Sequence, residues 1–261
     1  MNILDQIIAN KKREVAIKKK LFSINYLESS PLFKKPTISL ANRLRKSKSG
    51  IIAEHKRRSP SKQNINSSLS VIDVSSGYEK AGVSGISILT DGKYFGGSLE
   101  DLNAACEVTS IPILRKEFII DEYQILESKA NGADVILLIA SVLSRNEIQK
   151  LSDFGKNLSL EILLEVHNED ELNKSLNSNI DMVGVNNRDL QTFKVNLENS
   201  KNLADIIPLD FVKVSESGIN DFNSIIELQN YGFQGFLVGE NFMKSNNPGE
   251  TAAAFIKKIE S

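Results

Sequence analysis

From residue 50 onward, short apolar runs without a helical period alternate with stretches in which apolar residues recur every three or four positions. The first pattern is typical of strands buried on both faces, and the second of amphipathic helices. We expect strands at Gly50–Glu54, Gly85–Leu89, Ile111–Lys116, Asp134–Ile139, Glu161–Val166, Asp181–Val185, Phe211–Ser215 and Gly235–Gly239. We expect helices near Val71–Ala81, Leu99–Val108, Glu122–Asn131, Arg145–Lys156, Asp170–Asn177, Leu197–Ile206, Phe222–Tyr231 and Glu250–Ile259.

Strand–helix units repeated in series predict an α/β fold with a parallel sheet. The eight expected units are the number that closes a (β/α)8 barrel, the TIM barrel, and 261 residues is a usual length for that fold. An open doubly wound sheet is the alternative, but it normally carries a glycine-rich phosphate loop after its first strand. Residues 54–62 contain no glycine, which favours the barrel.

The segment before the first strand is expected to be helical. We predict a helix over residues 2–22, a connector over 23–37 and a short helix over 39–45. The composition does not change abruptly after residue 50, so residues 1–261 are expected to form one domain, with residues 1–47 as its N-terminal helical extension.

The first of these helices carries an apolar stripe and a basic cluster. The stripe consists of Ile3, Leu4, Ile7 and Ile8, and the basic cluster of Lys11, Lys12, Arg13, Lys18, Lys19 and Lys20. A basic amphipathic helix can bind a membrane surface or nucleic acid. Acidic residues lie nearby, however, and the net charge of the chain is -1. We therefore interpret the basic residues as a solvated face, with no nucleic-acid or membrane partner.

The composition is that of an ordinary globular protein, with 41% hydrophobic and 25% charged residues. The single cysteine, Cys106, excludes an internal disulfide and is expected to be a small buried side chain within a helix. No apolar run approaches the ~20 residues that cross a membrane, and the N-terminus lacks the charge order of a signal peptide. We expect a cytoplasmic protein and a monomer.

Polar residues follow several expected strands at the point where each strand ends. They are Glu54 and Lys56 after the first strand, Lys116 after the third, Glu165 after the fifth, Asn186 and Arg188 after the sixth, and Glu216 and Ser217 after the seventh. In a (β/α)8 barrel these ends converge on one mouth, where active sites lie. Desolvation can lower the pKa of a lysine there, and neighbouring charges perturb one another. The pattern predicts an acid–base site.

A metal site is the weaker interpretation, because the chain has only two histidines. Alternation along the first strand directs His55 away from the mouth. His167 comes two residues after Glu165 and is expected to be a solvated loop residue. We expect no metal ligand among the residues of the mouth.

Two further groups of residues near the strand ends suggest what the mouth binds. Ser217-Gly218 and Gly239-Glu240 end the last two strands, where barrels often bind phosphate through backbone N–H groups, and Ser59 can add a hydroxyl from the loop after the first strand. The apolar residues just beyond strand ends are Pro60, Phe95, Phe118 and Leu190. Around one mouth they would form a wall for an aromatic ring.

Seven short motifs in barrel order resemble those of the indole-3-glycerol phosphate synthase family of tryptophan biosynthesis. They are Ile52–Lys62, Leu89–Asp91 with Tyr94–Ser98, Leu114–Asp121, Glu165–His167, Val185–Leu190, Val214–Ile219 and Leu237–Glu240. The resemblance implies a carboxy-lyase that uses no cofactor. Its reaction closes the pyrrole ring of 1-(2-carboxyphenylamino)-1-deoxyribulose 5-phosphate, with loss of water and carbon dioxide, to form indole-3-glycerol phosphate.

The resemblance also implies roles for the polar residues. Lys116 would be the general acid that polarises the substrate ketone while the aryl carbon attacks it. Lys56 would meet the substrate carboxylate and help in dehydration. Glu165 would be the base or proton relay, and Glu54 would orient one of the two lysines.

Binding roles are implied for the remaining residues, and a covering role for the N-terminal extension. Asn186, Glu216 and Ser217 would position the substrate hydroxyls and amine. The phosphate would be held by Ser59, Gly218, Gly239 and the backbone N–H of Glu240, with Arg188 at the rim.

The extension would shield the aromatic half of the substrate, so a chain starting near Ser47 is expected to fold but to bind substrate more weakly. The alternative is an extension that only caps the bottom of the barrel.

Two positions depart from the family pattern. His55 stands where the family usually has an apolar or aromatic residue, and Gln63 where it usually has glycine. The first places a titratable group behind the first strand, and the second changes the expected flexibility of the loop after it. Neither removes a catalytic residue.

Two other functions compete with this interpretation. A phosphoribosylanthranilate isomerase would share the phosphate loops but needs a cysteine at a strand end, whereas Cys106 lies in an expected helix. A catalytically silent barrel that only binds a phosphorylated ligand or a partner protein would not need the set Glu54, Lys56, Lys116 and Glu165.

Overall fold

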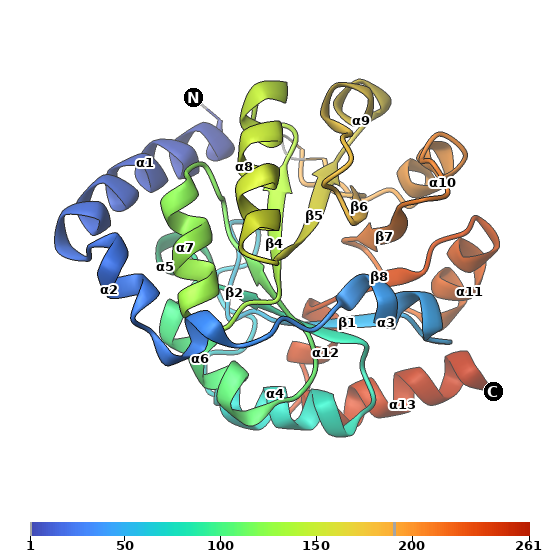
Figure 1. The fold of residues 1–261 in the computed structure, drawn as a ribbon. Helices are drawn as coiled ribbons and strands as arrows, with labels where there is room; N and C mark the ends of the chain where they lie inside the picture. The colour runs from blue at the N-terminus through green and yellow to red at the C-terminus, as the bar shows by residue number, and fades with distance from the viewer. Residues whose placement is uncertain (1, 190–191) are drawn as a thin grey trace.

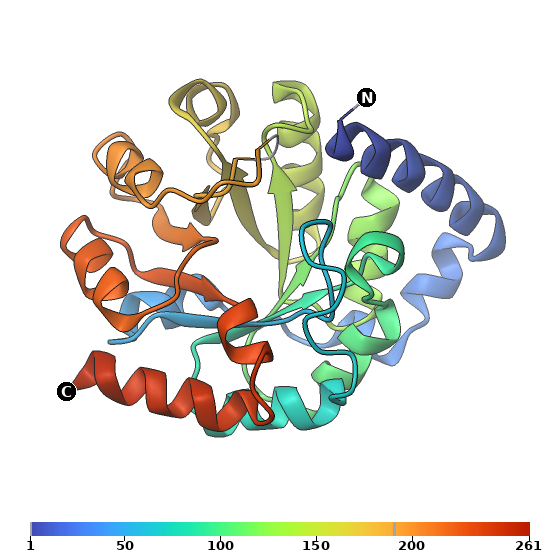
Figure 2. The same cartoon turned by 180° about the vertical axis from the view of Figure 1, so that it is seen from behind.

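A computed structural model describes residues 2–189 and 192–261, and within them eight parallel strands close into a barrel surrounded by helices (Figures 1 and 2). Each strand pairs with its neighbours in sequence, and the last pairs with the first. The strands are β1 (Ile51–His55), β2 (Gly85–Leu89), β3 (Ile113–Lys116), β4 (Val135–Ile139), β5 (Glu161–Val166), β6 (Met182–Asn186), β7 (Val212–Glu216) and β8 (Gly235–Val238). The predicted TIM barrel is confirmed.

The helices that connect the strands lie close to the predicted ranges. They are α4 (Val71–Lys80), α6 (Leu99–Val108), α7 (Glu122–Ala130), α8 (Arg145–Asn157), α9 (Glu169–Ser175), α10 (Glu198–Ala204), α11 (Phe222–Asn230) and α13 (Pro248–Glu260). Two short helices, α5 (Gly92–Phe95) and α12 (Glu240–Met243), were not predicted, because a single turn is too short to show a helical period. Cys106 is buried in α6, as expected.

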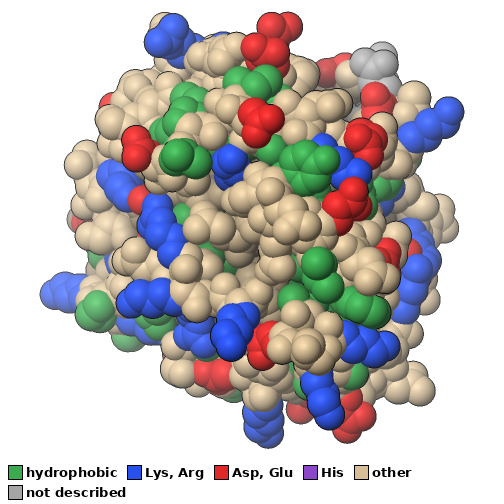
Figure 3. Space-filling model, turned by 90° about the vertical axis from the view of Figure 1, so that its right-hand side faces the viewer, with side chains coloured by type: hydrophobic (Ala, Val, Ile, Leu, Met, Phe, Trp, Pro, Cys, Tyr) green, Lys and Arg blue, Asp and Glu red, His purple; other side chains and the backbone are tan. Residues whose placement is uncertain are grey.

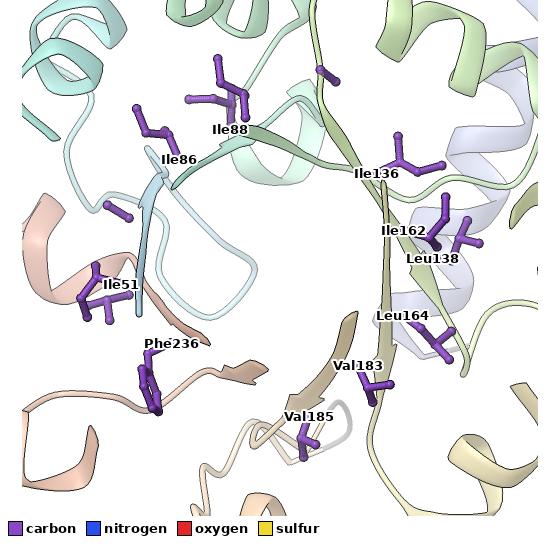
Figure 4. Close-up of a cluster of buried hydrophobic side chains, with 14 of the residues drawn as sticks. Ile51, Ile86, Ile88, Ile136, Leu138, Ile162, Leu164, Val183, Val185 and Phe236 are labelled. Carbon is purple, nitrogen blue, oxygen red and sulfur yellow. The ribbon is translucent and has the colours of Figure 1, made fainter. Parts of the chain in front are cut away.

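Alternation along the strands divides the apolar core into two layers. Outward-facing side chains pack between the strands and the helices, as Figure 4 shows for Ile51, Ile86, Ile88, Ile136, Leu138, Ile162, Leu164, Val183, Val185 and Phe236. The second layer fills the barrel interior and comprises Ile52, Leu114, Val135, Leu137, Ile139, Leu163, Met182, Val212, Val214 and Leu237. Since side chains repeat every second residue, the interior positions run directly on to the polar residues at the strand ends.

The N-terminal segment contains more structure than the sequence predicted. It forms α1 (Ile3–Leu21), α2 (Ile24–Glu28), the 3-10 helix η1 (Pro31–Lys34) and α3 (Leu40–Lys46). The connector predicted over residues 23–37 is therefore wrong. Ser23 caps α2 by accepting a hydrogen bond from the Tyr26 N–H, and buried Leu27 packs with α7. No helix within the described residues is long and apolar enough to cross a membrane.

Helix α3 closes the bottom of the barrel, the end at which the strands begin. Leu40 and Leu44 are completely buried in the same cluster as the interior side chains, and α3 lies in front of the barrel in Figure 1. The Glu161 carboxylate at the start of β5 accepts hydrogen bonds from the N–H groups of Leu40, at 2.8 Å, and Ala41, at 3.0 Å. A carboxylate at a helix N-terminus satisfies unpaired N–H groups and favours the helix dipole.

Candidate active site

The strand register brings the predicted polar side chains together at the opposite end, the mouth. Lys116, Glu165 and Glu216 each come two residues after an interior apolar residue and therefore point along the same inner face. Asn186 on β6 is directly paired with Glu216 on β7. Gly184 makes room for this arrangement, because a Cβ at that position would lie 2.2 Å from Glu216 Oε1.

Lys116 is the centre of the charged cluster. Its Nζ atom lies 2.9 Å from Glu165 Oε2 and 2.7 Å from Glu216 Oε2. The other oxygen of Glu165, Oε1, accepts a hydrogen bond from Asn186 Nδ2 at 3.0 Å. Lys56 forms a separate pair with Glu54, 2.6 Å from Nζ to Oε1. The predicted convergence of strand ends is therefore seen for all five strands that supply these groups, β1, β3, β5, β6 and β7.

Burial and neighbouring charges set the protonation of the cluster. Burial alone lowers the pKa of Lys116, as expected from the sequence, but Glu165, Glu216 and Glu54 more than offset it, so the pKa is raised. Burial raises the pKa of Glu165, yet Lys116, His167 and Asn186 outweigh burial and lower it. Burial and then Glu165 raise the pKa of Glu216 against the attraction of Lys116. Two carboxylates with opposite shifts suit opposite roles, one as a base and one as a proton donor.

An apolar cavity of about 130 Å³ lies on one side of Lys116. The rings of Phe95 and Phe118 line it with centroids 5.9 Å apart, as the sequence predicted for these two residues. Leu137 and Ile139 of β4 and Leu4 of α1 also line it. The sequence reasoning missed the β4 residues, although alternation places both on the inner face.

A polar cavity of about 280 Å³ lies on the other side of Lys116. Of the predicted residues, it is lined by Glu54, Lys116, Arg188, Glu216, Ser217, Gly218, Gly239 and Glu240. Ser217 and Gly218 have positive φ angles of 68° and 83°, a conformation that is uncommon for serine. Lys244, which was not predicted, also lines this cavity and forms an ion pair of 2.7 Å with Glu240.

The loop after β1 is arranged differently from the rest of the predicted site. Within the described chain, Ser59 and Pro60 lie outside the linings of the apolar and polar cavities. Hydrogen bonds between Ser59 and Lys62 form a tight turn, and Lys62 Nζ reaches Glu240 at 2.9 Å, so the loop is tied to α12. Leu190 lies outside the described residues.

The two histidines occupy contrasting places. His55 faces outward from β1, as predicted, and only 1% of it is exposed. Burial and then Arg57 lower its pKa to about 4. The expectation of a solvated His167 is wrong, because 13% of its side chain is exposed and it contacts two carboxylates.

The prediction of a solvated basic face on α1 is wrong for Lys11. Its side chain is 1% exposed, and Nζ lies 3.0 Å from Asp91 Oδ2 and 3.1 Å from Glu117 Oε1. Asp91 follows β2 and Glu117 follows β3, so this lysine fastens α1 to the rim of the mouth. The signal was in the sequence, since Ile7, Lys11 and Val15 recur every four residues and share one helix face.

Asn187 is a second structural residue that the sequence reasoning missed. Its Nδ2 donates hydrogen bonds to Ser215 Oγ at 2.9 Å and to the carbonyl oxygen of Glu216 at 3.0 Å. Its Oδ1 accepts bonds from the Ser200 N–H and hydroxyl. This buried amide therefore holds the ends of β6 and β7 and the start of the β7 loop in register.

Fold and site together define a (β/α)8-barrel enzyme with a lysine–carboxylate acid–base centre between an apolar and a polar cavity. The fold is shared with the solved structure "Crystal structure of KGPDC from Streptococcus mutans" at a TM-score of 0.62 and 14% identity, covering 81% of this chain and 97% of that one. The sequence profile of the family described as indole-3-glycerol phosphate synthase matches residues 4–255. The chain belongs to this family, which confirms the resemblance seen in the motifs.

Two curated relatives extend over nearly the whole chain. The indole-3-glycerol phosphate synthase of Bacteroides thetaiotaomicron is 48% identical over 259 residues, which cover 99% of each chain. That of Caldanaerobacter subterraneus is 40% identical over 257 residues, which cover 98% of each.

Proposed function

We propose that the chain catalyses the reaction of its family, in which 1-(2-carboxyphenylamino)-1-deoxyribulose 5-phosphate closes its pyrrole ring and loses carbon dioxide and water. The observation that carries the proposal is the position of Lys116. Its ammonium group lies between two carboxylates at the meeting point of an apolar and a polar cavity. A substrate with an aromatic ring at one end and a phosphate at the other needs such an arrangement.

Lys116 is the general acid in this proposal. Its raised pKa keeps it charged before substrate arrives, so it can donate a hydrogen bond to the ketone oxygen and a proton as the aryl carbon attacks. Negative charge develops on that oxygen in the transition state, and a cation held in a largely buried site stabilises it there.

Glu165 is the base or proton relay for the dehydration: after the attacking aryl carbon has lost its carboxylate as carbon dioxide, Glu165 takes a proton from the CH2 carbon next to the amine while the hydroxyl leaves as water. Its lowered pKa keeps it ionised, and Asn186 fixes one of its oxygens. Glu216, whose pKa is raised, donates to or accepts from the substrate hydroxyls and amine. Lys56, oriented by Glu54 at 2.6 Å, meets the substrate carboxylate and helps the hydroxyl to leave as water.

The phosphate is assigned to the loops after β7 and β8. Ser217, Gly218, Gly239 and the N–H of Glu240 line the polar cavity there, with Arg188 at its rim. Ser217 and Gly218 both have left-handed backbone conformations, and backbone N–H groups in such turns can form an anion-binding concavity. Ser59 is assigned a hydroxyl contact from the β1 loop, which Lys62 ties to Glu240.

The aromatic half of the substrate is assigned to the apolar cavity between Phe95 and Phe118. Leu4 contributes the wall nearest the N-terminus, so α1 shields this half from water while Lys11 holds the helix on the rim. Water exclusion strengthens the electrostatic interactions of Lys116.

We further propose one domain over residues 1–261, with 1–47 as its extension, acting as a cytoplasmic monomer without nucleic-acid or membrane partners. Buried contacts of α3 with the barrel interior support the single domain. The face in Figure 3 mixes basic and acidic side chains, and hydrophobic atoms are scattered over it, which gives no single-sign field for nucleic acid. Size-exclusion chromatography with light scattering tests the monomer.

Turnover of the carboxyphenylamino sugar phosphate, followed by the fluorescence of the indole product, tests the function. We expect turnover without any added cofactor. Binding without turnover would favour the silent barrel, and conversion of phosphoribosylanthranilate instead would favour the isomerase.

A further inference from the structure

His167 lies behind the proposed base and is held on its far side. Its Nδ1 is 3.3 Å from Glu171 Oε2, and the same oxygen accepts a hydrogen bond of 2.8 Å from the His167 N–H. Asn168 caps α9 by accepting a bond from the Glu171 N–H at 2.9 Å. The orientation of the ring is therefore fixed by the first turn of α9.

The other ring nitrogen faces Glu165. Nε2 lies 3.9 Å from Glu165 Oε1 and has no hydrogen-bond partner among the described residues. Oε1 is the oxygen that Asn186 binds, whereas Lys116 binds Oε2. A singly protonated ring that donates from Nδ1 to Glu171 would aim a lone pair at the Glu165 carboxylate. The doubly protonated ring gives each carboxylate an N–H.

We propose that His167 is a positioning residue that holds Glu165 ionised and oriented once Lys116 has turned to the substrate. The inference rests on the proposed function, because that function assigns Lys116 to the ketone. In the free protein Lys116 pairs with Glu165 at 2.9 Å. When its ammonium group moves to the substrate, Glu165 loses that cation, while Asn186 stays hydrogen-bonded to the other oxygen and His167 Nε2 stays 3.9 Å from it.

The charges around the ring agree with this role. Burial lowers the pKa of His167, but the hydrogen bond to Glu171 and the charges of Glu165, Glu171 and Glu216 raise it overall. The titratable or charged groups near the ring are Glu165 on β5, Glu171 on α9 and Glu216 on β7, with Arg188, Asp189 and Lys194 of the segment after β6 lining the same cavity. The acidic groups nearest to the ring favour the imidazolium ion.

The test is the pH dependence of kcat for full-length His167→Gln, His167→Lys and Glu171→Gln. The constant kcat reports groups in the substrate complex, where Lys116 is engaged. In His167→Gln we expect kcat to fall about tenfold and its acidic limb to move upward by about one pH unit, the effect of removing one nearby opposite charge. His167→Lys keeps a cation and is expected to retain the acidic limb of the parent. Glu171→Gln should give a smaller upward shift.

His55→Phe is the matched control, because the second histidine lies on the outward face of β1 and should leave the acidic limb in place. An acidic limb that stays in place in His167→Gln, whatever its kcat, would reduce His167 to a packing role and overturn the proposal. An equal shift in His167→Lys would overturn it as well. If His167→Gln does not fold, Glu171→Gln takes its place: an acidic limb of the kcat profile that does not move in this variant would also overturn the proposal. A parent protein that does not turn over the substrate would instead defeat the proposed function, and this inference with it.

Discussion

The two ends of the barrel are both covered by the N-terminal segment, but with opposite chemistry. At the bottom, α3 inserts Leu40 and Leu44 into an apolar interior. At the mouth, α1 approaches through the buried Lys11 and leaves cavities beside Lys116. Apolar burial stabilises a fold directly, whereas buried ions lose hydration that their pairing must offset. The bottom therefore contributes stability, and the mouth retains the charges to which the proposed mechanism assigns catalysis.

The largest expected effect is on chemistry at the mouth. Lys116→Met keeps the aliphatic length but removes the acid, so kcat should fall by about 10²–10⁴-fold in a protein that still folds. The melting temperature should fall as well, because Glu165 and Glu216 lose the cation between them. Lys150→Met is the control, because this lysine is 69% exposed on α8. Assays that follow the formation of indole-3-glycerol phosphate measure kcat for both variants. Activity of Lys116→Met within a few-fold of the parent would contradict the assignment.

Removing the cation that docks α1 should affect stability and binding together. Lys11→Met leaves Asp91 and Glu117 without their shared partner, which costs about 3–5 kcal/mol for a buried pair. Because α1 then detaches from the rim, KM should rise. Urea unfolding and steady-state kinetics on the same protein provide both values. A normal KM beside lowered stability would mean that α1 does not shield the substrate.

The bottom of the barrel should show the complementary result. Leu44→Ala removes a completely buried side chain and should lower the free energy of unfolding by about 2–5 kcal/mol without changing KM. A chain starting near Ser47, which is expected to fold as a barrel and to bind substrate more weakly, would lose α1 and α3 together. The two single substitutions separate the effects that this truncation combines. If Leu44→Ala raises KM, the bottom of the barrel also affects substrate binding, which would contradict the assignment of stability to one end and binding to the other.

Anion binding should stabilise the mouth more modestly. Inorganic phosphate should compete with substrate and raise the melting temperature. At a phosphate concentration a hundred times the dissociation constant, the free energy of unfolding should increase by about 2.7 kcal/mol. Ser217→Glu places a carboxylate in the polar cavity and should abolish both effects. Thermal scans over a phosphate series measure this. No stabilisation of the parent would show that the phosphate site is misplaced.

The smallest effect at neutral pH is expected behind β1. The folded pKa of His55 is about 4, below the ordinary value of about 6.5. Between these values the unfolded chain binds more protons, so stability is lost as the pH falls from about 6.5 to about 4. His55→Phe should flatten this slope and leave stability near pH 7 almost unchanged. An unchanged slope between pH 4 and 6.5 would show that another group causes the acid sensitivity.

How far the sequence could predict the molecule depended on whether a residue followed a local period. Apolar runs identified the strands, and alternation from Leu163 to Glu165 placed the Glu165 carboxylate at the mouth. The partners of Lys11 could not be predicted, since Asp91 and Glu117 are distant in sequence and become neighbours only when β2 and β3 pair. The contact of His167 with Glu165 likewise depends on how α9 begins, which periodicity does not reveal.

The bond between α3 and Glu161 has a consequence for the order in which the chain can assemble during synthesis. Leu40 and Glu161 are 121 residues apart in sequence. Every residue between them must leave the ribosome before the start of α3 acquires its acceptor. Domains of this size emerge at about 5–20 residues per second, so the two leucines of α3 spend several seconds or more without their final neighbours. Helix α3 is therefore made before any strand of the barrel, but it reaches its native contacts only after β5 has begun to emerge.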